Sequence, residues 1–158
     1  MSIERVRAYF RSLGIEERII EFDTSSATVA LAAAALGCEE GRIAKTLSFR
    51  VGERPVLVVA AGDARIDNSK YKSYFGVKAK MLSHEEAEVL VGHAVGGVCP
   101  FAVNEGVEVY FDVSLRRFST VFPACGSANS AIKLPISELE DHAHPIAWID
   151  VCKLPEEA

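Results

Sequence analysis

One lysine lies where the sequence pattern predicts a hydrophobic side chain. Residues 43–51 alternate as a β-strand does, and Lys45 falls on the same face as the apolar residues of the segment. These are Ile43, Leu47, Phe49 and Val51. An ammonium group on the core side of a strand needs an ion pair, a route to solvent along its own stem, or an anionic ligand in a cavity. Lys45 is therefore a candidate ligand-binding residue, and a strand-end lysine that simply reaches solvent is the alternative.

A glycine-rich loop is the second candidate. Gly96 and Gly97 are followed by Pro100, so two flexible positions precede a fixed one. Such a loop can present backbone N–H groups to a ligand oxygen and let a bulky group approach closely. An ordinary connection between a helix and a strand is the alternative. The turn at residues 125–129 is a third candidate, although a plain hairpin turn would have the same composition.

Other reactive side chains give weaker signals. Cys99 could act as a nucleophile with His93 as its base, but a free cysteine is far more often a small buried hydrophobic residue. The four histidines show no metal-ligand spacing, and no phosphate-binding or dinucleotide-binding motif is present in the sequence, so we expect neither a metal nor a cofactor. Asp112 is expected to cap the turn at 113–115.

Local signals predict the elements that must position these residues. Helices are expected at 3–13 with Ser2 as cap, 28–36 ending at Gly37, 67–75, 83–91 with a capping box of Ser83 and Glu86, and 137–142. Strands are expected at 19–22, 43–51, 56–61, 77–82, 107–111, 120–123, 131–134 and 146–151. Helices interrupt the strands irregularly, so we predict an α+β fold in which helices flank a curved, mostly antiparallel mixed sheet. One domain should span residues 1–158.

Composition limits the partners and the compartment. The 158 residues carry a net charge of −5, so nucleic acid must be met by a local basic patch. Two clusters are candidates, one of Lys70, Lys72, Lys78 and Lys80, the other of Arg42, Lys45 and Arg50. The apolar stretches are shorter than the ~20 residues that cross a bilayer, so no membrane is expected. The four cysteines form no C-x-x-C pair and fit a reduced cytoplasm.

The chain resembles the YbaK/prolyl-tRNA synthetase-associated editing domain family in three successive segments. They are residues 25–36 (SSATVALAAAAL), 43–49 (IAKTLSF) and 92–101 (GHAVGGVCPF). A strand with A-K-T-L followed by a G-x-x-x-P loop is a specific combination. The resemblance extends over about residues 19–139.

The resemblance implies a hydrolase that removes a non-cognate amino acid from the terminal adenosine of tRNA, typically tRNA for proline that carries alanine or cysteine. It implies an essential role for Lys45 and a catalytic loop of Gly96, Gly97 and Pro100. The implied substrate-binding residues are Phe22, Thr46, Phe101, Gly126 and Ser127. The implied partners are aminoacyl-tRNA and, because no synthetase body accompanies the motifs, prolyl-tRNA synthetase acting in trans.

The sequence offers no Ser/His/Asp triad or acid–base pair. We therefore expect water to attack the ester while the backbone of residues 96–100 stabilises the oxyanion and a substrate hydroxyl or thiol assists. Two alternatives remain, a non-catalytic module that holds an aminoacyl or nucleotide group, and a hydrolase of small esters or thioesters. The sequence does not decide among alanine, cysteine, serine and threonine as the amino acid removed, nor does it indicate the oligomeric state.

Overall fold

The computed structural model describes residues 2–26, 28–94 and 96–155. Its centre is a six-stranded sheet with the order β8-β6-β2-β3-β5-β9. These strands are β2 (Ile43–Val51), β3 (Arg54–Ala61), β5 (Glu108–Asp112), β6 (Thr120–Pro123), β8 (Leu134–Pro135) and β9 (Ala147–Ile149). Two short antiparallel ribbons accompany it, β1 (Ile19–Glu21) with β7 (Ser130–Ile132) and β4 (Arg65–Ile66) with β10 (Cys152–Lys153).

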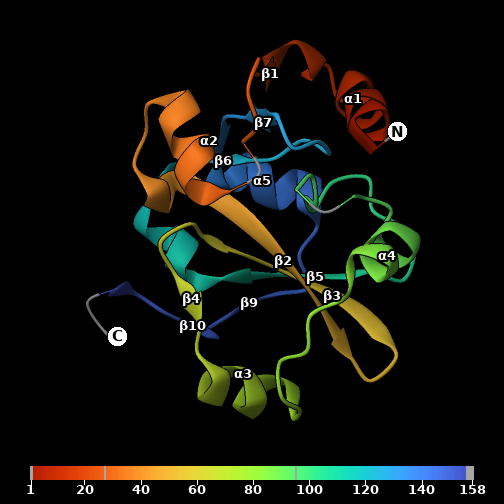
Figure 1. Cartoon of the computed structure of the whole chain (residues 1–158), viewed down its shortest axis with the longest axis vertical. Coiled ribbons are helices and arrows are strands. Elements are labelled where there is room, and N and C mark those ends of the chain that lie inside the picture. The colour runs from red at the N-terminus through yellow and green to blue at the C-terminus, as the bar shows by residue number, and fades with distance from the viewer. Residues whose placement is uncertain (1, 27, 95, 156–158) are drawn as a thin grey trace.

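The curved mixed sheet confirms the predicted fold class. Of the seven strand pairings among the described residues, four are antiparallel, including the longest, between β2 and β3. Within the six-stranded sheet, however, β6 runs parallel to β2, and β3, β5 and β9 run parallel to one another. Figure 1 shows β2 and β3 running diagonally through the molecule, α1 and α2 at one end, and α3 at the other.

Local capping signals placed most helices correctly. The α-helices are α1 (Ser2–Ser12), α2 (Val29–Leu36), α3 (Asn68–Phe75), α4 (His84–Glu86) and α5 (Ile136–Ala143). Short helical turns are η1 (Glu16–Arg18), η2 (Glu40–Arg42), η3 (Ala87–Val91) and η4 (Val113–Arg117). Gly37 ends α2 in a left-handed conformation as predicted, but Thr28 caps the helix by accepting a hydrogen bond from the N–H of Leu31, where Thr24, Ser25 or Ser26 was expected to supply the cap. Asp112 caps η4 as expected.

Four local predictions were wrong in detail. Ser2 lies inside α1, and its hydroxyl donates to the carbonyl of Gly126 instead of capping the helix. Residues 77–82 were predicted as a strand but form only a single bridge, between Met81 and Phe49, because the segment follows the edge of β2 only briefly. Met81 is 58% exposed. Residues 131–134 divide between β7 and β8, and residues 146–151 contribute only the shorter β9. The β4–β10 ribbon was not predicted.

The core lies around β3, whose residues 56–61 are fully buried. Helix α1 packs onto it through Phe10, whose ring centroid is 4.8 Å from that of Phe101. A smaller cluster of Ala32, Ala33 and Ile43 packs α2 against the start of β2. None of the described helices is both long and apolar enough to cross a membrane.

Candidate functional site

A cavity of about 420 Å³ opens beside the first half of β2. Val29 and Ala32 of α2 form one wall, and the other walls come from β2, the segment leading into α4, the loop at 96–98 and the β6–β7 region. Hydrophobic side chains and hydroxyl groups line it, and the described lining residues include no carboxylate. Its volume lies within the range of sites that bind small molecules. We call it the first cavity.

The edge of β2 facing this cavity is open. Strand β2 pairs with β6 only at Ile43 and Ala44. Further along the same edge, the carbonyl of Ser48 accepts from the N–H of Leu82 and the N–H of Arg50 donates to Lys80. Backbone groups of alternate residues in an antiparallel strand point to the same edge. Thr46, between Ala44 and Ser48, therefore directs its N–H and C=O into the gap, where they can bind a ligand.

Lys45 lines the first cavity, but its ammonium group is bound by the turn that follows β3. Its Nζ donates to the carbonyls of Gly62 and Ala64, and the distance to the Gly62 oxygen is 3.4 Å. Burial lowers the pKa of Lys45, and the nearby Cys152 and Asp63 oppose this shift. Lys45 is half-buried and its ammonium group is bound by two carbonyls, so it does not simply reach solvent; its role toward a ligand remains a prediction.

Two close approaches fix the turn that accepts the lysine. A Cβ on Gly62 would lie 2.2 Å from the carbonyl oxygen of Glu40, and one on Gly41 would lie 2.7 Å from the ring of Phe118. Only glycine allows the backbone between β3 and β4 to pack this tightly on η2. The acceptors of Lys45 are thereby held in place. Sequence analysis missed this turn, although the Gly62-Asp63 pair at the end of a buried strand was the signal for it.

Of the glycine-loop residues predicted to be catalytic, one lines the first cavity. Gly96 lines the cavity with a φ of 93°, and the neighbouring Val98 lines it too. Gly97 instead packs against the turn at Gly126 and Ser127, with an ideal Cβ position 2.5 Å from backbone atoms of both. Pro100 is buried behind the loop. The structure therefore brings Lys45, Thr46 and Gly96 to one cavity, whereas Gly97 and Pro100 are buried and do not line it.

The remaining predicted substrate-binding residues do not line the first cavity. Phe101 is fully buried against Phe10 in the core. Phe22 exchanges hydrogen bonds with Asn129, and Gly126 accepts from Ser2. Ser127 donates to Asn129 or to Ser130, at 3.0 and 2.8 Å. The predicted contact of these four residues with substrate remains a prediction.

The geometry argues against Cys99 as a nucleophile. Its Sγ lies 3.6 Å from Nε2 of His93, but Nε2 is also 2.7 Å from the carbonyl of Phe101. A carbonyl only accepts, so Nε2 must carry the proton and cannot take one from the thiol. Burial raises the pKa of Cys99 to about 12, and burial also lowers the pKa of His93. Both side chains belong to the core.

Several lining residues were missed by sequence analysis. They are Ser26, Val29, Ala32, Met81, His84, Phe122, Ala124 and Ser130. The alanine-rich helix was recognised as a helix, but nothing in its sequence indicated that its small side chains leave room for a cavity. His84 is the one imidazole among the described lining residues. Throughout the described ranges, no three His, Cys, Asp or Glu residues lie together in a way that could hold a metal ion.

Comparisons with known proteins identify the family. The sequence model of the aminoacyl-tRNA editing domain matches residues 23–142, and the chain belongs to this family. Protein YwhH of Bacillus subtilis (strain 168), which is uncharacterised, is 54% identical over 154 residues, 97% of this chain and 98% of YwhH. Proline–tRNA ligase of Bacillus cereus (strain AH820) is 30% identical over 95 residues, which are 60% of this chain but only 16% of the ligase.

Solved structures agree with this family assignment. A proposed trans-editing enzyme for prolyl tRNA synthetase superposes with a TM-score of 0.85 at 27% identity, over 96% of this chain and 97% of that one. The hypothetical protein APE2540 gives a TM-score of 0.77 at 27% identity, over 90% and 99% of the two chains. The predicted family resemblance is thus confirmed, and the cavity beside Lys45 lies within the matched region.

Proposed function

We propose that this chain hydrolyses the ester between a small non-cognate amino acid and the 3′-terminal adenosine of tRNA, with tRNA for proline as the first substrate to test. The observation that carries the proposal is the convergence of Lys45, Thr46 and Gly96 on one cavity inside an aminoacyl-tRNA editing domain. The similarity to a segment of proline–tRNA ligase favours tRNA for proline. Such a role in translation would place the protein in the cytoplasm.

The first cavity favours catalysis by positioning. No carboxylate among its described lining residues can act as a general base. In the proposed reaction a water oxygen attacks the ester carbonyl, and backbone N–H groups of the loop at Gly96 and of Thr46 stabilise the developing oxyanion. The bond to the ribose oxygen then breaks, and the water proton passes to that oxygen through a hydroxyl or thiol of the substrate. The products are the free amino acid and uncharged tRNA.

The small side chains around the cavity support a small amino acid as the group removed. Ala32, Ala44, Ala124 and Ala131 all line it. A pocket discriminates one methylene by only about 1–3 kcal/mol, so alanine, cysteine and serine are all substrates to compare. Prolyl-tRNA synthetase is a proposed partner in trans, because this chain matches only a small part of that ligase.

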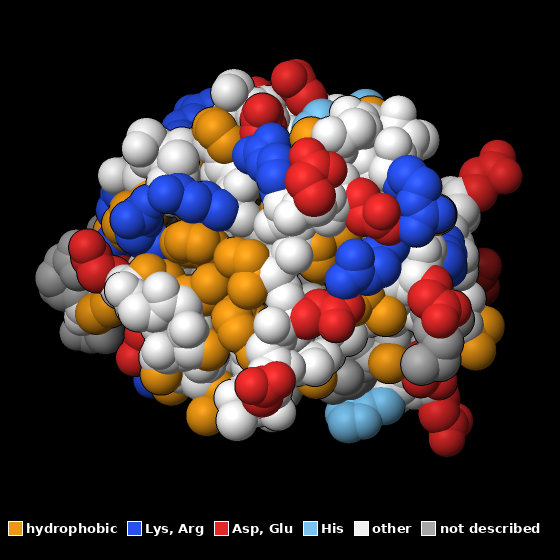
Figure 2. All heavy atoms as spheres, turned by 90° about the horizontal axis from the view of Figure 1, so that it is seen from above, with side chains coloured by type: hydrophobic (Ala, Val, Ile, Leu, Met, Phe, Trp, Pro, Cys, Tyr) orange, Lys and Arg blue, Asp and Glu red, His pale blue; other side chains and the backbone are white. Residues whose placement is uncertain are grey.

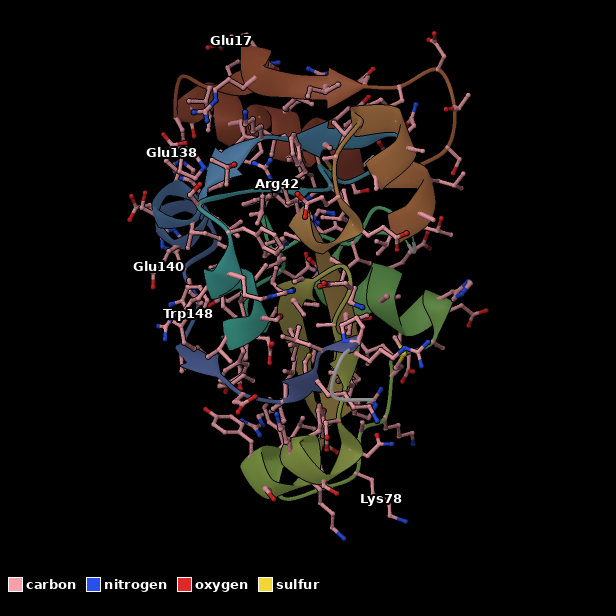
Figure 3. All side chains as sticks on the ribbon, turned by 90° about the vertical axis from the view of Figure 1, so that its left-hand side faces the viewer. Glu17, Arg42, Lys78, Glu138, Glu140 and Trp148 are labelled. Carbon is pink, nitrogen blue, oxygen red and sulfur yellow. The ribbon has the colours of Figure 1, made fainter. Side chains whose placement is uncertain are left out.

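The test is deacylation of tRNA for proline charged separately with alanine, cysteine, serine and proline, with and without prolyl-tRNA synthetase. Lys45→Ala and Lys45→Met should abolish hydrolysis of the preferred ester, whereas Lys78→Ala should not. Lys78 is the matched control because it is exposed and lies beyond α3, at the far end of the molecule from Glu17 (Figure 3). Circular dichroism must show that each variant is folded.

One observation favours a non-catalytic binding module as the second candidate. The carbonyls of Gly62 and Ala64 hold the ammonium group of Lys45 in a fixed position. A fixed cation of this kind can bind an anionic ligand without catalysing any reaction. Binding of the charged tRNAs without hydrolysis of any, even with the synthetase present, would support that alternative and contradict the proposed hydrolase.

A further inference from the structure

A second cavity, of about 440 Å³, lies on the other side of Lys45. The turn from Gly62 to Arg65 forms one wall, and the chain from Lys153 to Pro155 forms another. Among the described lining residues, Lys45 alone is common to both cavities. In Figure 1 the β4–β10 ribbon of this cavity lies away from α1. The proposed ester hydrolysis leaves this cavity without a role.

The ribbon that borders the second cavity pairs two like charges. Strands β4 and β10 are antiparallel, and their register sets Lys153 directly opposite Arg65. Residues directly opposite on two strands have Cβ atoms only about 4.5–5.5 Å apart, and like charges there are destabilising. Within the described ranges neither side chain takes part in a salt bridge. Two cations held together in this way favour an anion between them.

Among the described residues, the carboxylates that line the second cavity do not balance its cations. Asp63 lines the cavity but is bound on both oxygens by the guanidinium of Arg117, one contact measuring 3.0 Å. Glu40 lines it as well and is exposed. The cations at the cavity are Lys45, Arg65 and Lys153. An electropositive cavity in a chain of net charge −5 is a local feature of the kind that a polyanion requires.

The end of the molecule that carries α1 and α2 does not offer the same concentration of positive charge. Figure 2, which looks onto that end, shows Lys and Arg side chains interspersed with Asp and Glu. Around α3, Lys72, Lys78 and Lys80 are exposed, and the half-buried Lys70 contacts Asp150 at 3.2 Å. The second cavity also adjoins the first through Lys45, which no lysine of that patch does.

We propose that the second cavity binds the phosphodiester on the 5′ side of the terminal adenosine while the aminoacyl ester occupies the first cavity. This inference rests on the proposed function. A nucleotide at the 3′ end of RNA carries its ester on the ribose and its phosphate a few bonds away, which matches two cavities that share one lysine. Arg65 offers a planar donor pair to phosphate oxygens, and Lys153 adds a point charge.

The test compares Arg65→Gln with Lys153→Gln, singly and together, on two substrates with the same ester. One is mischarged tRNA, and the other is the corresponding aminoacyl-adenosine, which has no phosphate. The double variant should raise KM for the tRNA about tenfold or more, as expected when a charge-assisted hydrogen bond is removed, with kcat unchanged. Hydrolysis of aminoacyl-adenosine should not change. The slope of log KM against log salt should fall by about 0.7 for each phosphate that the variant no longer neutralises.

The matched control is Lys72→Gln with Lys78→Gln, which removes the same charge from exposed positions on and after α3 and also tests the lysine cluster around α3 as the site of RNA contact. An equal rise in KM for this control would show a general charge effect and overturn the inference. So would an unchanged KM in the Arg65/Lys153 variant, or a parallel loss on aminoacyl-adenosine, because the residues would then serve the ester site.

Binding separates this inference from the proposed function. Anisotropy of a labelled single-stranded RNA ending in CCA should show weaker binding to the Arg65/Lys153 variant and undiminished binding to the lysine control. If the native protein hydrolyses no ester but binds the RNA more tightly than the Arg65/Lys153 variant does, the proposed hydrolase function is wrong and the proposed phosphodiester site is supported. If inorganic phosphate competes as well as the RNA does, the cavity is a free-anion site and the inference is wrong.

A stability measurement gives an independent signature. Removing one of two opposed cations relieves their repulsion, so Arg65→Gln or Lys153→Gln should raise the melting temperature of the ligand-free protein at low salt, and added salt should reduce the gain. A lower melting temperature would show that the two residues stabilise the ribbon and would remove the argument for an anion between them.

Discussion

The substitution Gly97→Ala tests whether the glycine loop is placed by its contact with the neighbouring turn. The added Cβ would lie 2.5 Å from the backbone carbon of Gly126 and the backbone nitrogen of Ser127. Non-bonded carbon atoms prefer separations of about 3.5–4.0 Å, so the two segments must move apart by about 1 Å. Both contacts are backbone atoms, and no side-chain rotation can relieve them. The loop at Gly96 must therefore shift relative to the first cavity.

The expected loss of stability is moderate, and the expected loss of activity is large. Overpacking of this kind costs about 1–3 kcal/mol, which for a chain of this size lowers the melting temperature by about 2–12 °C. Domains are typically stable by about 5–15 kcal/mol, so the variant should remain folded at 25 °C. Misplacing catalytic groups by about 1 Å costs about 100-fold, and we expect kcat/KM for deacylation to fall by that factor.

The assay measures deacylation at 25 °C beside thermal unfolding, with Gly52→Ala as the control. Gly52 lies in the β2–β3 turn with a φ of 62°, and a Cβ there meets no atom within 4 Å. Alanine at this position must adopt a left-handed backbone conformation, which costs about 1–2 kcal/mol of stability, and the substitution should leave activity intact. Equal activities of the two variants, with comparable stability loss, would refute the reasoning that this contact positions a catalytic loop.

Three further predictions use other features of the molecule. Cys99→Ser should keep most of the deacylase activity because the thiol is fully buried with its pKa raised to about 12, and near-complete loss would revive the nucleophile alternative. The backbone N–H of Ser83 and the guanidinium of Arg50 hold the pKa of Glu86 at about 2, below the ~4.3 of an unfolded chain. Its stabilisation is therefore complete above about pH 5 and lost as pH falls toward 2, so Glu86→Gln should reduce the pH dependence of urea unfolding between pH 6 and 3. Finally, we propose that residues 1–158 fold as one domain, so that circular dichroism and Trp148 fluorescence should report a single coincident thermal transition; two transitions would contradict this.

Sequence predicted those elements whose ends are set by local chemistry. Gly37 ends α2 and the Ser83–Glu86 capping box begins α4 as predicted, because a cap is satisfied within one turn of chain. Strand β2 was placed at its observed bounds because its alternation is long. The prediction of a strand at 77–82 was wrong for the opposite reason. Pairing of this segment depends on the edge of β2, a distant part of the chain, and only one bridge forms there.

The candidate site was predicted at the residues whose type is unusual for their position. Lys45 and Gly96 were found because a lysine in an apolar strand face and a paired glycine both need an explanation. Phe101 was predicted to bind substrate because of its place in the motif, yet it packs in the core. A motif does not show which of its side chains face the core. The walls from α2 and β6 and the whole second cavity depend on tertiary contacts between distant segments, so no local pattern indicates them.

The three cations of the second cavity should differ in what their removal does to the free energy of unfolding. Lys45 is half-buried and satisfies two backbone carbonyls, so its removal leaves acceptors without a donor, a loss of about 1–3 kcal/mol for a buried group. Arg65 and Lys153 oppose each other, and removing either relieves repulsion. A purely structural role for Lys45 would explain the loss of stability when Lys45 is removed. It would not explain why two cations that repel each other lie beside it. Their shared explanation is an anion that all three contact, which is why activity and stability must be measured together for each of them.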